Sequence, residues 1–265
     1  MADTTTPPEA PTPAPQSSPS PRLLEARAFV QAITRISAQD TGTRAALRSG
    51  LGKQLDEVPR MHRIVAPLLP ARVLGDDEAQ RAFYAVAALL ATHTTRGSTT
   101  QPDKESSAVH ASTPADEDTN HRAAEAAPAT VDADAAQEQS VQAAAAARRR
   151  YVYGESLGLA FAAAVARGTR EGIRESAAET RLNLLTRQSS AGLHRHLPAA
   201  VRQLCDKRCP PDWARLLVDL RTWPQDRKRL SRRWLQDFYR ARHQDDLAAV
   251  RTADTTGTTE DDGGA

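Results

Sequence analysis

The sequence predicts an all-α protein of two small helical bundles, joined by a long disordered acidic linker and flanked by disordered termini. Two observations predict the class: apolar residues recur with helical periodicity, and neither alternating strand runs nor Asn-Gly hairpin signals occur. A third observation, long tracts that are poor in large apolar residues, divides the chain. The predicted order is a disordered tail (1–21), an N-terminal bundle (22–95), a disordered acidic linker (96–147), a basic C-terminal bundle (148–243) and a disordered acidic tail (244–265).

The three tracts predicted to be disordered share a composition that does not form a core. Residues 1–21 are nearly all Pro, Thr, Ser and Ala, and residues 244–265 are small and acidic. Residues 96–147 contain few large apolar side chains, and a structureless loop of that length is uncommon inside a compact domain. Such tracts bury too little apolar surface to offset the entropy of ordering. The Ala-rich end of the linker can extend the helix that follows it.

In the N-terminal bundle, "PRLLEARAFVQAITRIS" places Leu23, Phe29 and Ile33 on one helical face. The next segment, "TGTRAALRSGLG", predicts a short helix that begins at a threonine and stops at a glycine. A proline suited to the first helical turn begins "VPRMHRIVAPLL". The acids that open "DDEAQRAFYAVAALLATH" favour a helix N-terminus, so four helices are expected here.

The C-terminal bundle continues the pattern with five further helical segments. They are "GESLGLAFAAAVARG", "SAAETRLNLLTRQ", "LPAAVRQLCDKRC", "PDWARLLVDLRTW" and "QDRKRLSRRWLQDFYRAR". The first is rich in small residues, which permits close approach between helices. Pro224 is expected to end the fourth helix. Trp213 and Trp234 lie on apolar faces and are expected to pack in the core, whereas the environment of Trp223 is left open.

Charge is distributed very unevenly along the chain. The formal net charge is only +2, yet residues 148–243 contain 21 Lys and Arg against 9 Asp and Glu, a net charge of +12. Residues 22–95 contain 10 Lys and Arg against 7 Asp and Glu, a net charge of +3. The segments predicted to fold are therefore basic and the flexible ones acidic, which points to nucleic acid or another polyanion as a partner.

Several function classes lack support in the sequence. No basic cap precedes an apolar run at the N-terminus, and no apolar stretch approaches the length of a membrane helix, so a cytoplasmic location is expected. There is no glycine-rich phosphate loop, no HExxH and no GxSxG motif, so we expect no enzyme activity and no cofactor.

The segments "HRH" and "CDKRC" contain histidines and cysteines that could bind zinc. Cys205 and Cys209 lie at i and i+4 on one helix face, a workable pair for zinc. His194 and His196 are two residues apart and do not share a helix face, and Pro198 separates the two pairs. The alternative is two half-buried thiols and two histidines in a basic region. We expect no metal here, although the sequence leaves the role of the two cysteines open.

The last predicted helix carries the most specific basic pattern. On a helical wheel, Leu230, Trp234 and Phe238 share one side, and the opposite side is predicted to be a ridge of Arg229, Arg232, Arg233 and Arg240. No Asp or Glu is expected inside this ridge, unlike a solvated helix with paired charges. Clustered arginines repel one another, and a phosphate backbone would relieve that repulsion. The ridge is therefore predicted to contact nucleic acid.

The same region leaves an alternative open. The two helices around Trp223 and Pro224 could form a helix–turn–helix, as in a free-standing DNA-binding regulator. Their composition is rich in arginine and poor in Asn and Gln, which favours contacts to the backbone over reading of bases.

The ordered set of motifs resembles a known family. It comprises "TRAALRSG", "PRMHRIVAPLLP", "AFYAVAALLATH", an acidic gap, "SLGLAFAAAV", "ETRLNLLTRQ", "LPAAVRQL" and "DWARLLVDLRTWPQDRKRLSRRWLQDFY". Together they resemble the CasB family, the small subunit of the type I-E CRISPR surveillance complex Cascade. The resemblance covers both segments predicted to fold. The long N-terminus, the acidic insertion and the acidic tail depart from the family pattern.

The resemblance implies a non-catalytic, all-α protein present in two copies along a crRNA-guided complex. The implied partners are the Cascade backbone and large subunits, a second copy of the chain, the crRNA–target DNA R-loop and the displaced single-stranded DNA. The basic surface would stabilise the R-loop, whose formation is nearly balanced in base-pairing energy. The matching positions are Arg44, Arg48, Arg181, Arg187, Arg202, Lys228 and Arg229.

Overall fold

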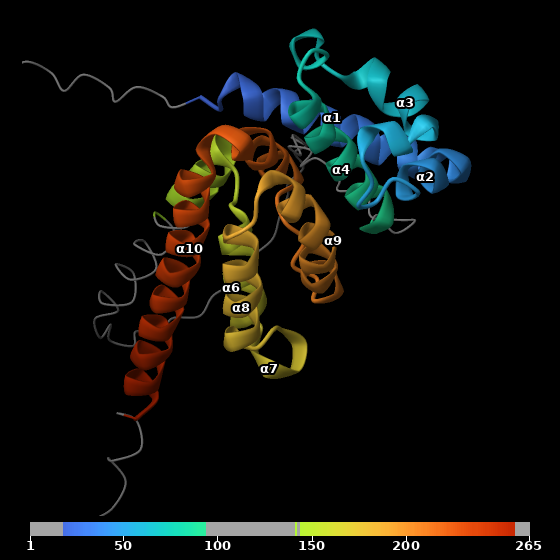
Figure 1. Ribbon diagram of the computed structural model, residues 1–265. Coiled ribbons are helices and arrows are strands. Elements are labelled where there is room, and N and C mark those ends of the chain that lie inside the picture. Colours follow the sequence, from blue (N-terminus) through green and yellow to red (C-terminus); the bar gives the residue numbers. More distant parts are fainter. Residues whose placement is uncertain (1–17, 94–140, 142–143, 258–265) are drawn as a thin grey trace, which may run out of the picture.

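The computed structural model describes residues 18–93, 141 and 144–257, and these residues form helices and connecting turns without any strand (Figure 1). The predicted all-α class is confirmed. The predicted linker 96–147 lies outside the described residues except for 141 and 144–147, which are helical. Most of the predicted N-terminal tail and the last eight residues of the C-terminal tail also lie outside them. None of the described helices is long and apolar enough to cross a membrane.

The N-terminal segment folds into four α-helices joined by short 3-10 turns. The α-helices are α1 (Pro21–Gln39), α2 (Thr41–Arg48), α3 (Pro59–Val65) and α4 (Asp77–His93), and the turns are Leu55–Glu57, Ala66–Leu68 and Ala71–Val73. Ser20 caps α1 by accepting a hydrogen bond from the backbone N–H of Leu23. Asp40 caps α2 by accepting from Gly42 and Thr43. Side-chain caps therefore set the starts of these helices.

The C-terminal segment begins with the helical residues 144–153 and continues through five helices. These are α6 (Leu157–Ala166), α7 (Gly168–Glu171), α8 (Glu175–Thr186), α9 (Ser190–Asp206) and α10 (Trp213–Gly257). In Figure 1, α1 to α4 gather at one end of the molecule, and α8, α9 and the second part of α10 extend away from them.

Helix α10 differs from the prediction at two points. Pro224 was expected to end a helix, whereas the chain departs from helical geometry only at Asp226 and then continues as the second part of α10. A disordered tail was expected from Gln244, whereas α10 continues to Gly257. Arg242 explains part of this extension, because it pairs with Asp245 at 3.0 Å and with Asp246 at 3.2 Å, one turn further along the helix.

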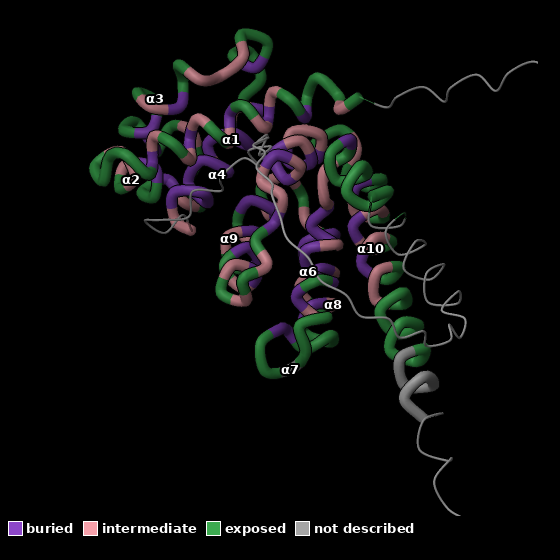
Figure 2. Tube along the Cα trace, turned by 180° about the vertical axis from the view of Figure 1, so that it is seen from behind, coloured by how far each residue is buried: buried purple, intermediate pink, exposed green. Residues whose placement is uncertain are grey.

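One hydrophobic core joins the two segments. Buried residues of α1 and α4 belong to the same cluster as those of α6, α8, α9 and α10. The bulkiest fully buried side chains are aromatic and come from both segments: Trp223, Trp234, Phe83, Phe161 and Phe238. Figure 2 shows the buried residues concentrated along α4 and on the facing sides of the helices that pack around it. The first part of α10 packs on α1 and α4, so the C-terminal bundle is anchored to the N-terminal one.

Two polar contacts fix this junction. Glu25 of α1 accepts a hydrogen bond from Arg221 of α10 at 2.7 Å and also pairs with Arg72. The guanidinium carbon of Arg221 lies 5.1 Å from the ring centroid of Phe83, a cation–π arrangement that places α10 against α4.

Helix α6 approaches α10 more closely than ordinary side chains would allow. A Cβ atom built at Gly158 would lie 1.9 Å from the backbone carbonyl oxygen of Trp234. The expectation that this small-residue helix approaches a neighbour closely is therefore confirmed. Trp234 itself is fully buried and Trp213 is half-buried against the core, as expected, while Trp223 is buried and donates its indole N–H to the carbonyl of Gln188.

Candidate nucleic-acid interface

Most of the basic residues predicted to bind nucleic acid are accessible. Arg48, Arg187, Arg202, Lys228, Arg229, Arg232 and Arg240 are exposed. Arg44, Arg181 and Arg233 are half-buried. Three of them form one group, three form a row on α10, and the remaining four are Arg181, Arg187, Arg229 and Arg233.

The first group, Arg44, Arg48 and Arg202, lies around the C-terminal end of α4 and is called the α4-end group below. Arg48 of α2 and Arg202 of α9 both act electrostatically on His93, the last residue of α4. Arg44 donates from Nε to the carbonyl oxygen of Ala91 at 3.3 Å, which holds α2 against the last turn of α4. Residues from two distant parts of the sequence thus form one basic surface.

His93 lies at the centre of this group. Its ring stacks on Trp213 with the ring centroids 6.5 Å apart and the planes 21° from parallel. Burial lowers the pKa of His93, Arg202 and Arg48 lower it further, and only Asp206 opposes them. The imidazole is therefore neutral at physiological pH, and the positive charge of the group comes from its arginines.

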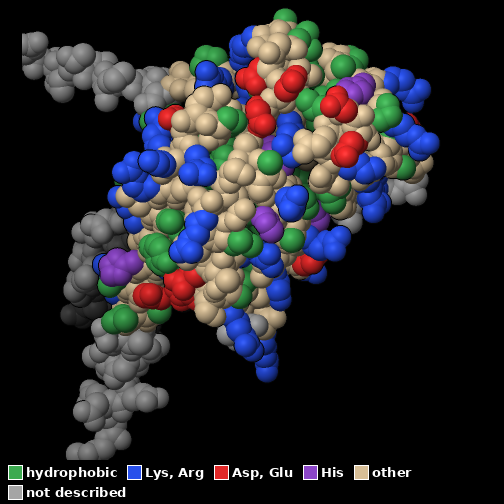
Figure 3. All heavy atoms as spheres, in the orientation of Figure 1, with side chains coloured by type: hydrophobic (Ala, Val, Ile, Leu, Met, Phe, Trp, Pro, Cys, Tyr) green, Lys and Arg blue, Asp and Glu red, His purple; other side chains and the backbone are tan. Residues whose placement is uncertain are grey.

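The second group lies on the second part of α10. Lys228, Arg232, Gln236 and Arg240 follow one another at steps of four residues and are all exposed. This row, called the α10 edge below, turns about 40° around the helix at each step, so its neighbours adjoin while its two ends lie about 120° apart. Within the described residues, the three cations of this edge form no ion pair. Figure 3 shows Lys and Arg side chains gathered where this part of α10 begins, and Asp and Glu further along it.

The prediction that no acid lies within the ridge is wrong for two of its arginines. Arg229 pairs with Asp226 at 2.8 Å, and Arg233 approaches Asp237 at 3.8 Å. The cause is local: these acids lie three and four residues from the arginines, which brings them onto the same side of the helix. The charge of both arginines is thus partly compensated before any ligand arrives.

Arg233 also does not point outward as the wheel predicted. It is half-buried because it follows Leu230 by three residues and adjoins the buried Trp234. Burial and the nearby Arg215 lower its pKa, and Asp219 and Asp237 oppose this. Arg233 therefore borders the core of α10 instead of forming the crest of a ridge.

The two predicted arginines of α8 lie on different sides of their helix. They are six residues apart, which places them about 120° from each other. Arg187 directly follows Thr186, whose carbonyl accepts a hydrogen bond from Ser231 of α10 at 2.9 Å. Arg187 is therefore close to the start of the α10 edge, whereas Arg181 stands apart.

The helix–turn–helix alternative finds no matching geometry at Trp223 and Pro224. Such a motif needs a turn of three or four residues between two helices. Here the chain kinks at the single residue Asp226 within α10, and the residues on both sides of the kink pack into the core. This segment does not present a separate recognition helix.

The cysteines and histidines weighed as zinc ligands are held in packing positions. His194 is buried on α9, where burial and Arg81 lower its pKa to about 4. Burial raises the pKa of the Cys205 thiol to about 11, which keeps it protonated at physiological pH. Among the residues that the structure describes, no three His, Cys, Asp or Glu side chains gather as metal ligands would.

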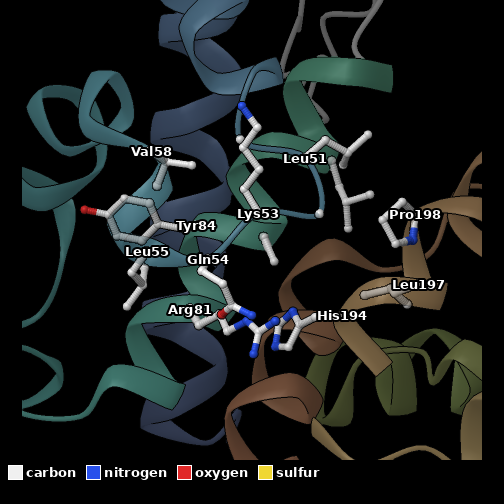
Figure 4. A pocket seen from close by; sticks show the side chains of 14 residues that line it. Leu51, Lys53, Gln54, Leu55, Val58, Arg81, Tyr84, His194, Leu197 and Pro198 are labelled. Atoms are coloured by element: carbon white, nitrogen blue, oxygen red, sulfur yellow. The ribbon is translucent and has the colours of Figure 1, made fainter. Parts of the chain in front are cut away.

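One polar cluster was missed by sequence reasoning. Arg81, in the middle of the apolar helix α4, lies beside His194 at a small cavity that Lys53 also lines (Figure 4). An arginine within an apolar helical pattern was the signal available in the sequence. Its pairing with a histidine of α9 depends on tertiary packing.

Comparisons with known proteins agree with this architecture. A family model described as "CRISPR-associated protein Cse2 (CRISPR_cse2)" matches residues 43–239. No curated protein matches the chain.

Solved structures are similar over most of the chain. A chain of a "CRISPR RNA-guided surveillance complex" is 29% identical, with a TM-score of 0.56 over 86% of this chain and 99% of that one. A chain of a "CRISPR RNA-guided surveillance complex, pre-nicking" is 28% identical, with a TM-score of 0.58 over 86% and 98%. "Crystal structure of M. ruber CasB" is 19% identical with a TM-score of 0.51, over 84% and 97%, and supports the fold alone. Since the family model spans well over half of the sequence, the chain belongs to the CRISPR-associated protein Cse2 family.

Proposed function

We propose that this protein is the non-catalytic small subunit of a crRNA-guided surveillance complex of the type I-E Cascade kind. In this role it binds the sugar–phosphate backbone and stabilises the R-loop and the displaced non-target strand. Its partners are the backbone and large subunits, a second copy of itself, crRNA and target DNA, all in the cytoplasm. Membership of the Cse2 family and the similarity to chains of surveillance complexes support the assembly part of the proposal.

The observation that carries the nucleic-acid part is the α10 edge. Lys228, Arg232 and Arg240 are exposed, belong to one row that winds slowly around a helix, and have no acidic partner within the described residues. A strand of phosphates neutralises such a row and releases counterions, which gives affinity without sequence preference. The α4-end group offers a second set of phosphate contacts at the other end of the core.

The role needs only modest affinity from this subunit. The heteroduplex in an R-loop is about as stable as the DNA duplex that it replaces, so a few backbone contacts to the displaced strand shift the balance. Arginine suits these contacts, because its planar donor fork matches two phosphate oxygens.

The test replaces Lys228, Arg232 and Arg240 together by alanine and measures single-stranded DNA binding against salt concentration. Three lost phosphate contacts reduce the slope of log K against log salt by roughly 2, at about 0.7 per contact. The matched control replaces Arg60, Arg170 and Arg174, which are exposed arginines outside both groups. Equal slopes for the two triple variants would reject the α10 edge as a nucleic-acid contact.

Assembly is tested separately. In a reconstituted complex, the triple variant is expected to co-purify with the other subunits but to form the R-loop more slowly on matched target DNA. Failure of the wild-type chain to enter the complex would reject the proposed place of this protein in it.

A further inference from the structure

A small cavity lies between α4, α9 and the loop that follows α2. Its volume is about 20 Å³, space for roughly one water molecule or one ligand oxygen. Figure 4 shows the Arg81 and His194 side chains pointing toward one another beside Gln54, with Lys53 at the loop above them. Residues 50–54, Arg81 and Tyr84 of α4, and His194, Leu197 and Pro198 of α9 contribute to the lining.

Arg81 is the unusual member of this lining. Only 9% of the residue is exposed, its Nε atom is buried without a hydrogen-bond partner, and within the described residues it forms no ion pair. A buried guanidinium without an anion is unfavourable, because the lost hydration is not replaced. Binding of an anion beside the Arg81 guanidinium would therefore be favourable.

The surroundings of Arg81 supply further donors and no competing acid. His194 is 6% exposed, and the exposed residue Lys53 also lines the cavity, with its side chain running away from the Arg81–His194 pair in Figure 4. No Asp or Glu lines the cavity. Two of the glutamates on adjoining turns already have partners: Glu78 accepts from the hydroxyl of Ser190, and Glu57 accepts from the backbone N–H of Gln54.

The cavity is adjacent to the α4-end group. Arg48 precedes the lining residue Gly50 by two positions, and Arg202 lies eight residues beyond His194 on α9, about 12 Å along the helix axis. A nucleic-acid strand that contacts Arg48 and Arg202 would therefore run close to the mouth of the cavity.

We propose that one phosphate group of the bound nucleic-acid strand binds at the mouth of this cavity, with one phosphate oxygen in the cavity beside Arg81 and His194 and the exposed side chain of Lys53 turning toward the group. This inference rests on the proposed nucleic-acid role. Phosphate is favoured over a carboxylate of a protein partner because the exposed Arg48 and Arg202 lie on α2 and α9, the helices that border the site. The planar fork of Arg81 and the point charge of Lys53 are also the two standard means of binding phosphate oxygens.

The first arm of the test uses inorganic phosphate and the full chain, at constant ionic strength. Phosphate at about five times its Kd raises the Tm of a protein of this size by about 2–4 °C. Arg81→Met and Lys53→Met are expected to lose most of this rise, whereas Arg60→Met, which removes an exposed charge elsewhere, retains it. General stabilisation by the salt is the same in every variant and cancels in the comparison. An equal rise in wild type and both cavity variants would overturn the proposal.

A second experiment tests whether the natural ligand of the cavity is a phosphate group of the nucleic-acid strand. Arg81→Met is expected to reduce the salt slope of single-stranded DNA binding by about 0.7, one phosphate contact. An unchanged slope, or a Tm rise as large with acetate as with phosphate, would assign the cavity to another anion and overturn the proposal. A wild-type protein that shows the phosphate-specific rise but no DNA binding would reject the proposed function while leaving an anion site. If the wild-type protein binds single-stranded DNA and Arg81→Met leaves the salt slope of that binding unchanged, only this inference is rejected.

Discussion

The indole N–H of Trp234 donates to the carboxylate of Asp219 at 2.8 Å, across the kink of α10, and both residues are fully buried. The same carboxylate pairs with Arg215 at 2.6 Å. Burial raises the pKa of Asp219, while Arg215 and the indole N–H oppose that rise. The contact fixes the angle between the two parts of α10 and hence the direction in which the α10 edge projects.

Removal of this carboxylate should destabilise the fold strongly. Asp219→Ala leaves the mostly buried charge of Arg215 without its acidic partner, and loss of one member of a buried pair costs about 3–5 kcal/mol. The free energy of unfolding in urea measures the loss. Asp226→Ala is the control, because it removes only an exposed pair with Arg229 and should cost at most about 1 kcal/mol. Similar losses in the two variants would contradict the assigned role of Asp219.

A methyl group at Gly158 should separate α6 from α10. The added Cβ would lie 1.9 Å from the carbonyl oxygen of Trp234, and a backbone atom inside two packed helices cannot move aside cheaply. Gly158→Ala is expected to cost about 3 kcal/mol, the upper end for overpacking. Gly75→Ala, where a Cβ meets nothing within 4 Å, should change stability by less than about 1 kcal/mol. Thermal unfolding of the two variants provides the comparison, and equal Tm values would count against the close approach.

His194 should make the protein less stable in mild acid. Its pKa is about 4 in the folded state against 6.5 for an ordinary histidine, because burial and Arg81 disfavour the charged form. The neutral form is therefore the one that folding favours. The stabilising contribution is complete above pH 6.5 and is lost as the pH falls from 6.5 toward 4, by about 3 kcal/mol in total.

The measurement compares unfolding free energies at pH 7.5 and pH 5 in buffers without phosphate. Of the total, about 2 kcal/mol is expected to be lost by pH 5 in wild type. His194→Gln should remove that part of the pH dependence, and His243→Gln, at an exposed position, should keep it. If His194→Gln loses as much unfolding free energy between pH 7.5 and pH 5 as the wild type does, other groups cause the acid sensitivity.

The two sides of the second part of α10 should contribute unequally to nucleic-acid binding. Arg229 must leave Asp226 before it can bind a phosphate, whereas Arg232 has no ion pair within the described residues. Arg232→Ala is therefore expected to weaken single-stranded DNA binding at low salt more than Arg229→Ala does. In an Asp226→Ala background, removal of Arg229 should become as costly as removal of Arg232. Equal effects of the two single substitutions in the wild-type background would show that the pairing with Asp226 does not matter.

The sequence predicted the helices well because their signals are local. The apolar spacing that buries Leu23, Phe29 and Ile33, and the capping residues that begin α1 and α2, operate within a few residues of one another. The extension of α10 beyond His243 was missed because its acidic composition was taken as a sign of disorder. Arg242 holds two of these acids as helix-spaced ion pairs.

The candidate site was predictable in composition but not in geometry. A helical wheel placed Arg229 and Arg233 on an outward ridge. In the structure both arginines pair with acids of the same helix, and Arg233 is also half-buried at the edge of the core. The spacing of Lys228, Arg232 and Arg240 by multiples of four residues was present in the sequence, but which edge remains exposed depends on where α8 packs.

By itself, then, the sequence determined an all-α chain with a basic, arginine-rich C-terminal segment, because periodicity and charge are properties of neighbouring residues. Only the tertiary structure decided that α10 packs on α1 and α4, that Arg48 and Arg202 meet at His93, and that Arg81 is buried beside His194. These contacts join residues far apart in the chain, and their positions follow from the shape of one shared core that no single segment encodes.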